Sequence, residues 1–160
     1  MSAKKKTWRE KLEEDRGLPR VLGPDELKNT KWGGGSCVIP APSEVNELMR
    51  TVPRGKLTTI DELRKALAAK HGAAIACPIT TGIFAWIAAH AAAEAQAAGA
   101  KQTTPFWRTL KSNGELNPKY PGGIARFKRE LRREGHRIQQ KGKRFFVLNF
   151  EQRLANLCGR

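Results

Sequence analysis

Apolar residues recur at helical spacing in two stretches that follow Pro42. Ser43 is a capping residue type and opens a predicted helix that runs to about Met49. A second helix is predicted after the extended segment 57–59, with Thr59 as its cap and Glu62 three residues later, which is the capping-box spacing. The inward faces of the two helices are formed by Val45, Leu48, Met49, Leu63, Ala66 and Leu67.

A third and longer helix is predicted from Pro78, a residue suited to a first helical turn, to the stop signal at Gly99. Its inward face is predicted from helical spacing to be Ile83, Phe84, Ile87 and Ala91. Two consecutive helices with a short connection are the core of a helix-turn-helix.

The segment RIQQKGKRFFVLNF, at 137–150, reads as two short strands around a Lys-Gly-Lys turn. Helices followed by a hairpin predict a mainly α fold with a small β-hairpin, arranged as a winged helix-turn-helix-like domain over residues 43–155.

Residues 1–42 are predicted to be an N-terminal arm. Trp8 and Leu12 indicate a short amphipathic helix, and the run Trp32-Gly33-Gly34-Gly35 indicates a flexible break. The arm has enough apolar side chains to pack on the domain, and a partly disordered tail is the alternative.

The net charge and its distribution along the chain say more about a binding partner than overall composition does. The 160 residues contain 30 Lys and Arg and 15 Asp and Glu, a net charge of +15. Residues 101–160 alone contain 15 basic and 4 acidic residues. Such a field attracts a polyanion, because neutralised phosphates release counterions. A solvated face, or a surface for acidic protein or lipid, would have the same composition.

The cysteines and histidines exclude several function classes. Cys37, Cys77 and Cys158 form no close pair, and no Cys or His spacing is typical of a zinc site, so no disulfide framework, metal or cofactor is expected. Cys77 precedes Pro78 at a helix start, where a thiol can become reactive, although free Cys is more often a small buried residue. The N-terminus has no apolar core like a signal peptide's, and no segment is apolar enough to span a membrane, so a cytoplasmic location is predicted.

The stretch PFWRTLKSNGELNPKYPGGIARFKRELRREG, at 105–135, carries the strongest motif. Together with VPRGKLTT, at 52–59, it resembles the O6-alkylguanine-DNA alkyltransferase family, whose reactive loop reads Pro-Cys-His-Arg. The resemblance covers about Val45 to Gly135. It implies a DNA-binding domain in which Thr58, Thr59 and Ser112 approach DNA, and in which the groove-facing turn carries Ile79, Thr80, Thr81 and Gly82. It also implies an alkyl pocket bordered by Ile60, Phe106, Trp107, Arg108, Tyr120, Gly122, Gly123 and Glu134.

Four positions depart from the family pattern. Phe106 stands at the acceptor Cys and Trp107 at the His, and no ring carbon of Phe can replace a thiolate nucleophile. Ile60 stands at the base-flipping Tyr and Ile79 at the inserted Arg. The resemblance therefore implies an alkyltransferase-like protein that lacks the acceptor Cys and does not transfer alkyl groups.

Each altered position has two interpretations. Phe106 and Trp107 could stack on an extruded base, or they could fill the vacated pocket. Ile79 could be an apolar wedge between base steps, or it could belong to the core. Tyr120 and the paired glycines could edge a nucleobase pocket, or they could form a turn that needs positive φ.

The sequence therefore predicts a non-enzymatic DNA-binding protein with weak sequence preference. Its partner would be duplex DNA, either intact or damaged, and a repair protein is a further candidate partner; the oligomeric state is not predicted. Phosphate contacts are expected from Arg132, Arg133, Lys141 and Lys143. The alternatives are a nucleobase- or DNA-modifying enzyme with a rebuilt pocket around Glu134 or Cys77, and a protein-interaction module.

Overall fold

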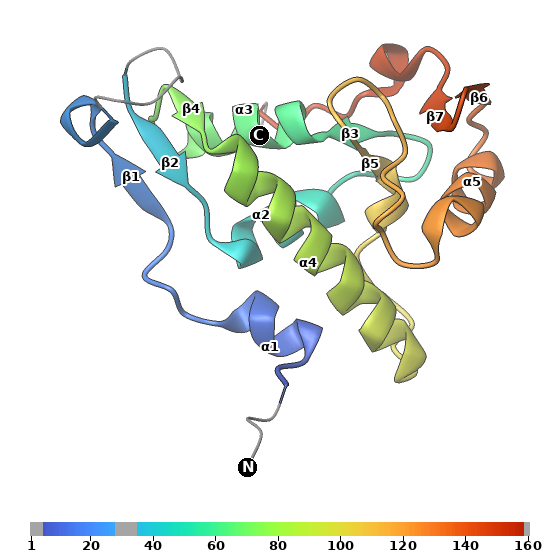
Figure 1. Ribbon diagram of the computed structural model, residues 1–160, viewed down its shortest axis with the longest axis horizontal. Coiled ribbons are helices and arrows are strands. Elements are labelled where there is room, and N and C mark those ends of the chain that lie inside the picture. The colour runs from blue at the N-terminus through green and yellow to red at the C-terminus, as the bar shows by residue number, and fades with distance from the viewer. Residues whose placement is uncertain (1–4, 28–34, 159–160) are drawn as a thin grey trace.

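The computed structural model describes residues 5–27 and 35–158. Trp32, Gly33 and Gly34 of the predicted flexible break lie outside these residues. Over the described part the chain is rich in helix with small sheets, as predicted (Figure 1). The helices are α1 (Trp8–Glu13), α2 (Pro42–Arg50), α3 (Ile60–His71), α4 (Pro78–Ala97) and α5 (Gly123–Arg133). The 3-10 turns are η1 (Pro24–Leu27), η2 (Phe106–Arg108) and η3 (Phe150–Arg153).

The strands are short and form three separate sheets. Strand β1 (Arg20–Leu22) pairs antiparallel with β2 (Cys37–Ile39), and β2 pairs parallel with β4 (Ile75–Ala76). Strand β3 (Thr58–Thr59) pairs parallel with β5 (Thr109–Leu110). Strands β6 (Ile138–Lys141) and β7 (Arg144–Val147) form the antiparallel hairpin, and the Gly142 turn that joins them has a positive φ. The hairpin was predicted, whereas the other two sheets were not.

Local signals set most of the helix ends. The Thr59 hydroxyl accepts the Glu62 N–H at 3.2 Å and caps α3, as predicted. The helix α2 begins at Pro42 rather than at Ser43, because Pro42 occupies its first turn and the Glu44 carboxylate accepts the Ala41 N–H at 3.0 Å. The helix α4 begins at Pro78 and ends at Ala97, two residues before Gly99, as predicted.

The core lies between α2, α3, α4 and α5. It is built from the buried side chains of Met49, Leu57, Leu63, Leu67, Phe84, Ile87, Phe106, Leu110, Phe127 and Leu131. Ile83, which was predicted to face this core, is instead 46% exposed. The helix α4 is apolar around most of its circumference, so spacing alone does not show which side is buried.

The N-terminal segment packs on this core, as predicted. Trp8 of α1 lies edge-on to Trp86 with ring centroids 4.8 Å apart and stacks on His90 at 4.4 Å, both on α4. The carboxylate of Glu94 accepts the backbone N–H of Trp8 at 3.1 Å. The division of the chain at residue 42 stays a prediction, although β2, before that residue, and β4, after it, lie in one sheet.

Candidate nucleic-acid interface

Phe106 fills the place where the resemblance implies an alkyl pocket. Its side chain is 1% exposed, and its ring lies edge-on to Trp107 at 5.4 Å and to Tyr120 at 6.2 Å. Tyr120 in turn stacks on Phe127 with ring centroids 5.7 Å apart. The guanidinium of Arg126 covers the Phe106 ring at 5.0 Å. These rings pack on one another as core residues do, and the ring at the acceptor position faces no solvent.

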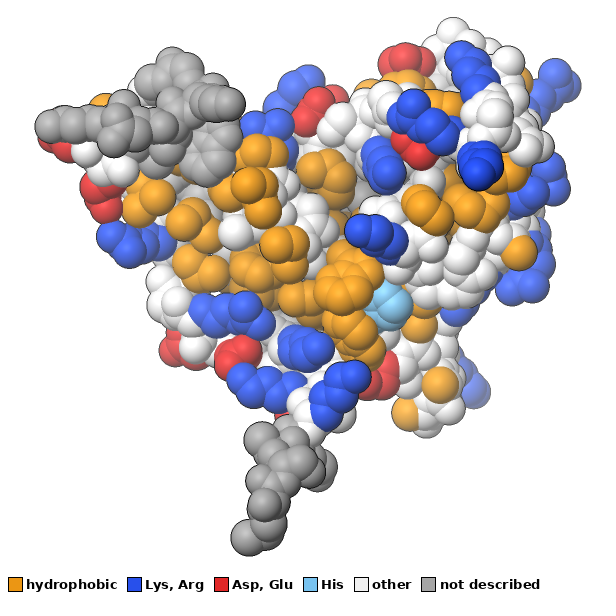
Figure 2. All heavy atoms as spheres, in the orientation of Figure 1, with side chains coloured by type: hydrophobic (Ala, Val, Ile, Leu, Met, Phe, Trp, Pro, Cys, Tyr) orange, Lys and Arg blue, Asp and Glu red, His pale blue; other side chains and the backbone are white. Residues whose placement is uncertain are grey.

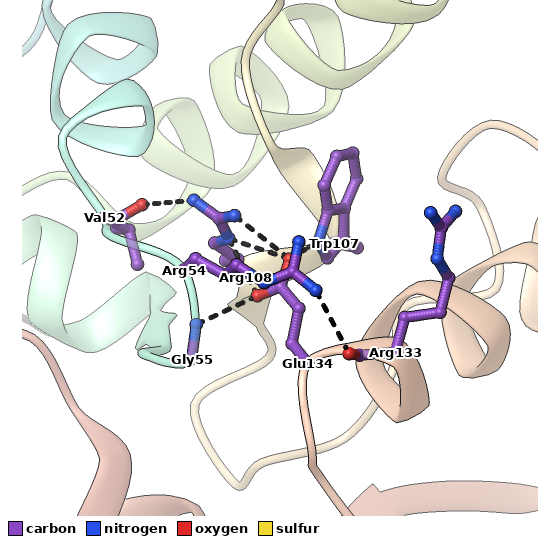
Figure 3. Close-up of polar contacts among 7 residues, drawn as sticks. All are labelled: Val52, Arg54, Gly55, Trp107, Arg108, Arg133 and Glu134. Carbon is purple, nitrogen blue, oxygen red and sulfur yellow. Dashed lines mark hydrogen bonds and ion pairs between the residues drawn. The ribbon is translucent and has the colours of Figure 1, made fainter.

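Glu134 lies beside this cluster and is held by three groups (Figure 3). Trp107 Nε1 donates to its carboxylate at 2.7 Å, Arg108 Nε and Nη2 donate at 2.9 and 3.0 Å, and the Gly55 N–H donates at 3.2 Å. Arg108 Nη1 also donates to the Val52 carbonyl at 2.7 Å. The cluster joins the turn before β3, the 3-10 turn η2 and the end of α5.

The protonation state of Glu134 follows from these contacts. Burial raises the pKa of Glu134, but the hydrogen bonds from Arg108, Trp107 and Gly55, with the Arg108 charge, outweigh burial and leave the pKa below its ordinary value. Glu134 is therefore an ionised carboxylate at neutral pH whose oxygens are already occupied. Such a group suits a structural role better than that of a general base, which needs a free oxygen facing a substrate.

Tyr120 and the paired glycines form a turn that leads into α5. Gly122 and Gly123 both have positive φ, at 80° and 65°, which explains glycine at both positions. A Cβ on Gly122 would lie 2.6 Å from the Cβ of Arg126, so this turn also lacks room for a side chain. Burial raises the pKa of Tyr120. Ile60, at the base-flipping position, packs half-buried against the core.

The predicted groove-contacting residues divide into buried and accessible sets. Thr58, Thr59 and Thr81 are at most 2% exposed, and the Thr81 hydroxyl donates to the Cys77 carbonyl at 2.7 Å. Their side chains do not face solvent and so are not available for contact with DNA in this conformation. Ile79 is 64% exposed, Gly82 has open space where a Cβ would stand, and Ser112 is exposed. These three remain candidates for contact with DNA.

Ile79 does not belong to the core, which was one of its two interpretations. Thr80 beside it is half-buried, and its hydroxyl oxygen is buried with no hydrogen-bond partner among the described residues. Ile83 lies one helical turn after Ile79 on the same exposed side of α4. Helical spacing from Ile79 puts Ile83 on the same side, but the sequence could not show that this side is exposed, because α4 is apolar nearly all round.

The predicted phosphate contacts lie together on one end of the molecule. Exposed basic side chains follow the last turn of α5 and the hairpin: Arg132, Arg133, Arg137, Lys141, Lys143 and Arg144, hereafter the basic surface. Figure 3 shows the Arg133 side chain pointing away from the Glu134 cluster. In Figure 2 Lys and Arg side chains gather at the upper right, over the region of the hairpin in Figure 1.

Three of the four acidic side chains of residues 101–160 are turned inward and paired, whereas that of Glu151 is exposed. Glu115 is 8% exposed and lies 2.6 Å from Arg144, and Glu130 is 16% exposed and lies 3.6 Å from Arg133. Glu134 is 4% exposed and pairs with Arg108. Hydrogen bonding to Arg144 lowers the pKa of Glu115, although desolvation opposes the shift. Little negative charge is therefore left on the surface to balance the exposed cations.

The cysteines provide no evident reactive centre. Cys37 and Cys77 are buried at the β2–α4 side of the core, and Cys158 is exposed; all three are free thiols. Burial raises the pKa of Cys37, and the neighbouring Cys77 adds to this effect.

Among residues 5–27 and 35–158, no three His, Cys, Asp or Glu side chains are grouped so that they could hold a metal ion. No helix in these two ranges is long and apolar enough to cross a membrane.

No protein-family model matches this chain. No curated protein sequence matches it either. Two solved structures resemble its fold. One is S. pombe Atl1 in complex with damaged DNA containing O6-carboxymethylguanine, at 22% identity and a TM-score of 0.47. The other is S. pombe ATL in complex with DNA, at 21% identity and a TM-score of 0.46. Each likeness covers 71% of this chain and 93% of the other. Both likenesses are distant, so the function of this chain has to be inferred from its own residues.

Proposed function

We propose that this chain is a non-enzymatic DNA-binding protein that holds the phosphate backbone through its basic surface. The observation that carries the proposal is the orientation of charge over residues 101–160. The side chains of Arg133 and Arg144 are 67% and 57% exposed, while those of their acidic partners Glu130 and Glu115 are 16% and 8% exposed. A surface on which cations are in large excess, because most of the counter-charges are turned inward, concentrates a polyanion.

The arrangement of elements supports duplex DNA as that polyanion. The helices α3 and α4 are joined by a short connection and followed by a hairpin, as in a winged helix-turn-helix. In this class the second helix of the motif enters a groove while neighbouring elements contact the backbone. Here the N-terminal part of α4, with Ile79 exposed and open space beside Gly82, would approach a groove. Because most contacts would be made to phosphates, weak sequence preference is expected.

The proposal places the chain among alkyltransferase-like proteins that lack the transfer reaction. Phe106 stands at the acceptor position, is buried, and has no nucleophilic atom. The remaining question is whether damaged duplex is preferred. A pocket filled by Phe106 and Tyr120 gives an extruded base no room in this conformation, so we expect at most a small preference for an alkylated duplex.

The occupied carboxylate of Glu134 argues against the alternative of a base-modifying enzyme with a rebuilt pocket. That alternative needs an open pocket with a free polar group, whereas the Glu134 oxygens accept from Trp107, Arg108 and Gly55. The protein-interaction alternative keeps one supporting observation, the exposure of Ile79 and Ile83 on α4.

The test is a pair of measurements on the full chain. Fluorescence anisotropy titrations with an undamaged duplex, a second duplex of unrelated sequence and an O6-alkylguanine duplex should give similar dissociation constants, within about 10-fold of one another. The intact mass of the protein after incubation with alkylated DNA should be unchanged. If none of the three duplexes binds, DNA binding is refuted. An added alkyl group, on Cys77 or any other residue, would refute the non-enzymatic assignment.

A further inference from the structure

Two side chains of α4 hold the segment between β5 and α5 through one carbonyl group. The indole Nε1 of Trp86 and the Nε2 of His90 both donate to the carbonyl of Lys119, at 3.2 and 3.1 Å. Because a carbonyl oxygen only accepts, the His90 ring carries a proton on Nε2. Trp86 and His90 are four positions apart and lie on the same side of α4. Their two donors therefore fix Lys119 relative to that helix.

A third ring of this cluster comes from the N-terminal segment. Trp8 stacks on His90 at 4.4 Å and lies edge-on to Trp86 at 4.8 Å, and the rings of Trp86 and His90 lie 5.1 Å apart. Each ring thus contacts the other two. In the view of Figure 1, α1 lies on one side of α4 and the segment that leads into α5 lies on the other. Trp8 therefore restricts the rotamers of the two side chains that hold Lys119.

The segment held in this way, residues 117–123, is a compact unit, hereafter the flap. Within it the N–H groups of Lys119 and Tyr120 donate to Oδ1 and to the carbonyl of Asn117, at 3.0 and 3.2 Å. The Gly123 N–H donates to the Tyr120 carbonyl at 3.0 Å. These bonds lie inside the flap, so they persist when it moves as a unit. At its C-terminal end the paired glycines have positive φ, which glycine adopts without strain.

Tyr120 is the side chain of the flap that enters the core. It is 4% exposed, lies edge-on to Phe106 and stacks on Phe127. Movement of the flap away from α4 would withdraw this ring and leave space beside Phe106. The Lys119 carbonyl belongs to the residue next to Tyr120, so the two hydrogen bonds from α4 act close to the ring that closes this space.

The helix α1 is suited to local release. It has six residues, none of them buried, and a helix of this length is not stable without its packing. Its contacts with α4 include the Trp8 ring and the N–H groups of Trp8 and Arg9, which donate to the Glu94 carboxylate at 3.1 and 3.2 Å. An element with few buried contacts opens at a lower free energy than the whole domain.

We propose that the N-terminal segment is a latch for the flap. With Trp8 docked, Trp86 and His90 hold the flap closed over Phe106. When Trp8 undocks, these two side chains lose their packing partner, the flap opens, and Tyr120 leaves the core. The chain's own N-terminal segment thus controls whether space exists beside Phe106. This device does not depend on the DNA binding proposed above.

Tyr120 is the only tyrosine of the chain, so its nitration by tetranitromethane reports opening of the flap. Mass spectrometry of the Tyr120 peptide measures nitrotyrosine, and hydrogen exchange of the flap amides is followed on the same proteins. Both reactions should be slow in the wild-type chain. In Trp8→Ala both should be about 10-fold faster, because the two hydrogen bonds to Lys119 are weakened.

The double variant Trp86→Phe/His90→Phe keeps the rings against Trp8 but removes both N–H donors. It should nitrate about 10-fold faster than wild type, while tryptic cleavage after Arg16 stays slow because α1 remains docked. The matched control is Leu67→Ala, which truncates a buried side chain of α3 outside the latch and destabilises the whole domain. Its nitration should be as slow as in wild type.

Three results would overturn the latch. They are a wild-type rate of nitration in Trp8→Ala, a wild-type rate in the double variant, and an equal increase in Leu67→Ala, which would mean that Tyr120 reacts through global unfolding. None of these measurements uses DNA, so their outcome is independent of the proposed function.

Discussion

The indole Nε1 of Trp107 donates a hydrogen bond of 2.7 Å to the carboxylate of Glu134, and this bond joins the 3-10 turn η2 to the C-terminal end of α5. Arg108 binds the same carboxylate from η2 as well. Two residues of η2 thus hold one carboxylate at the end of α5. Because the indole nitrogen only donates, the Trp107 contact fixes two elements and provides no proton acceptor on the ring.

Replacement of Glu134 by Gln should therefore change stability in a pH-dependent way. Because the pKa of Glu134 is lowered in the folded state, its contribution is fully present above its unfolded pKa of about 4.3 and is lost as pH falls through the folded pKa. At pH 7 the variant should lose about 3 kcal/mol of unfolding free energy, since one partner of a buried ion pair is removed.

Urea denaturation of both proteins between pH 7 and pH 3 measures this difference. The gap between wild type and Glu134→Gln should shrink as pH falls below about 4. Glu151→Gln is the control, because Glu151 is exposed and pairs with no cation within the described residues. A gap that stays constant over the whole pH range would show that Glu134 acts through its shape and not through its charge.

Replacement of Phe106 by Ala should destabilise the fold and leave DNA binding by the folded protein unchanged. Phe106 is 1% exposed, and truncation of a buried Phe typically costs about 3–5 kcal/mol. Denaturant titration gives the loss of stability, and anisotropy titrations corrected for the folded fraction give the affinity. A variant of normal stability that loses affinity only for alkylated duplex would mean that Phe106 stacks on a base.

Removal of Trp8 should loosen the N-terminal segment. The Trp8 ring packs on Trp86 and His90, and such aromatic pairs contribute about 0.5–1.5 kcal/mol each beyond the area that they bury. Trp8→Ala should therefore lower the melting temperature by several degrees and speed tryptic cleavage after Arg16. Trp8→Phe should recover most of the loss. Unchanged cleavage in Trp8→Ala would mean that Glu94 and the backbone of α1 hold the segment without the ring.

Elements with local signals could be predicted from the sequence. The Thr59 cap, the start of α4 at Pro78 and the hairpin turn at Gly142 each depend on residues within a few positions. The pairing of β2 with β4 could not be predicted in this way. The pairing brings together Cys37 and Ile75, which are far apart in the sequence. Strand β4 also has only two residues, too few to show an alternating pattern.

The candidate site likewise has features that the sequence could predict and features that it could not. The family motif singled out Trp107 and Glu134, and the structure brings them together although they are 27 positions apart. The motif could not show that Ile79 and Ile83 are exposed, because α4 has apolar residues on nearly every side and its buried face depends on how α2 and α3 pack. Nor could sequence show that Glu115 and Glu130 turn inward, since that requires their partners in space.

The salt dependence of duplex binding tests the central claim most directly. The slope of log Kd against log salt concentration should flatten by about 2–3 in the triple variant Arg132→Ala/Arg133→Ala/Lys141→Ala, because each phosphate contact contributes about 0.9. The matched control is Arg9→Ala/Arg50→Ala/Lys101→Ala, which removes the same charge from around the C-terminal end of α4, outside the basic surface, and should change the slope little. Equal slopes for wild type and the first variant, or equal flattening in both variants, would contradict phosphate binding by the basic surface.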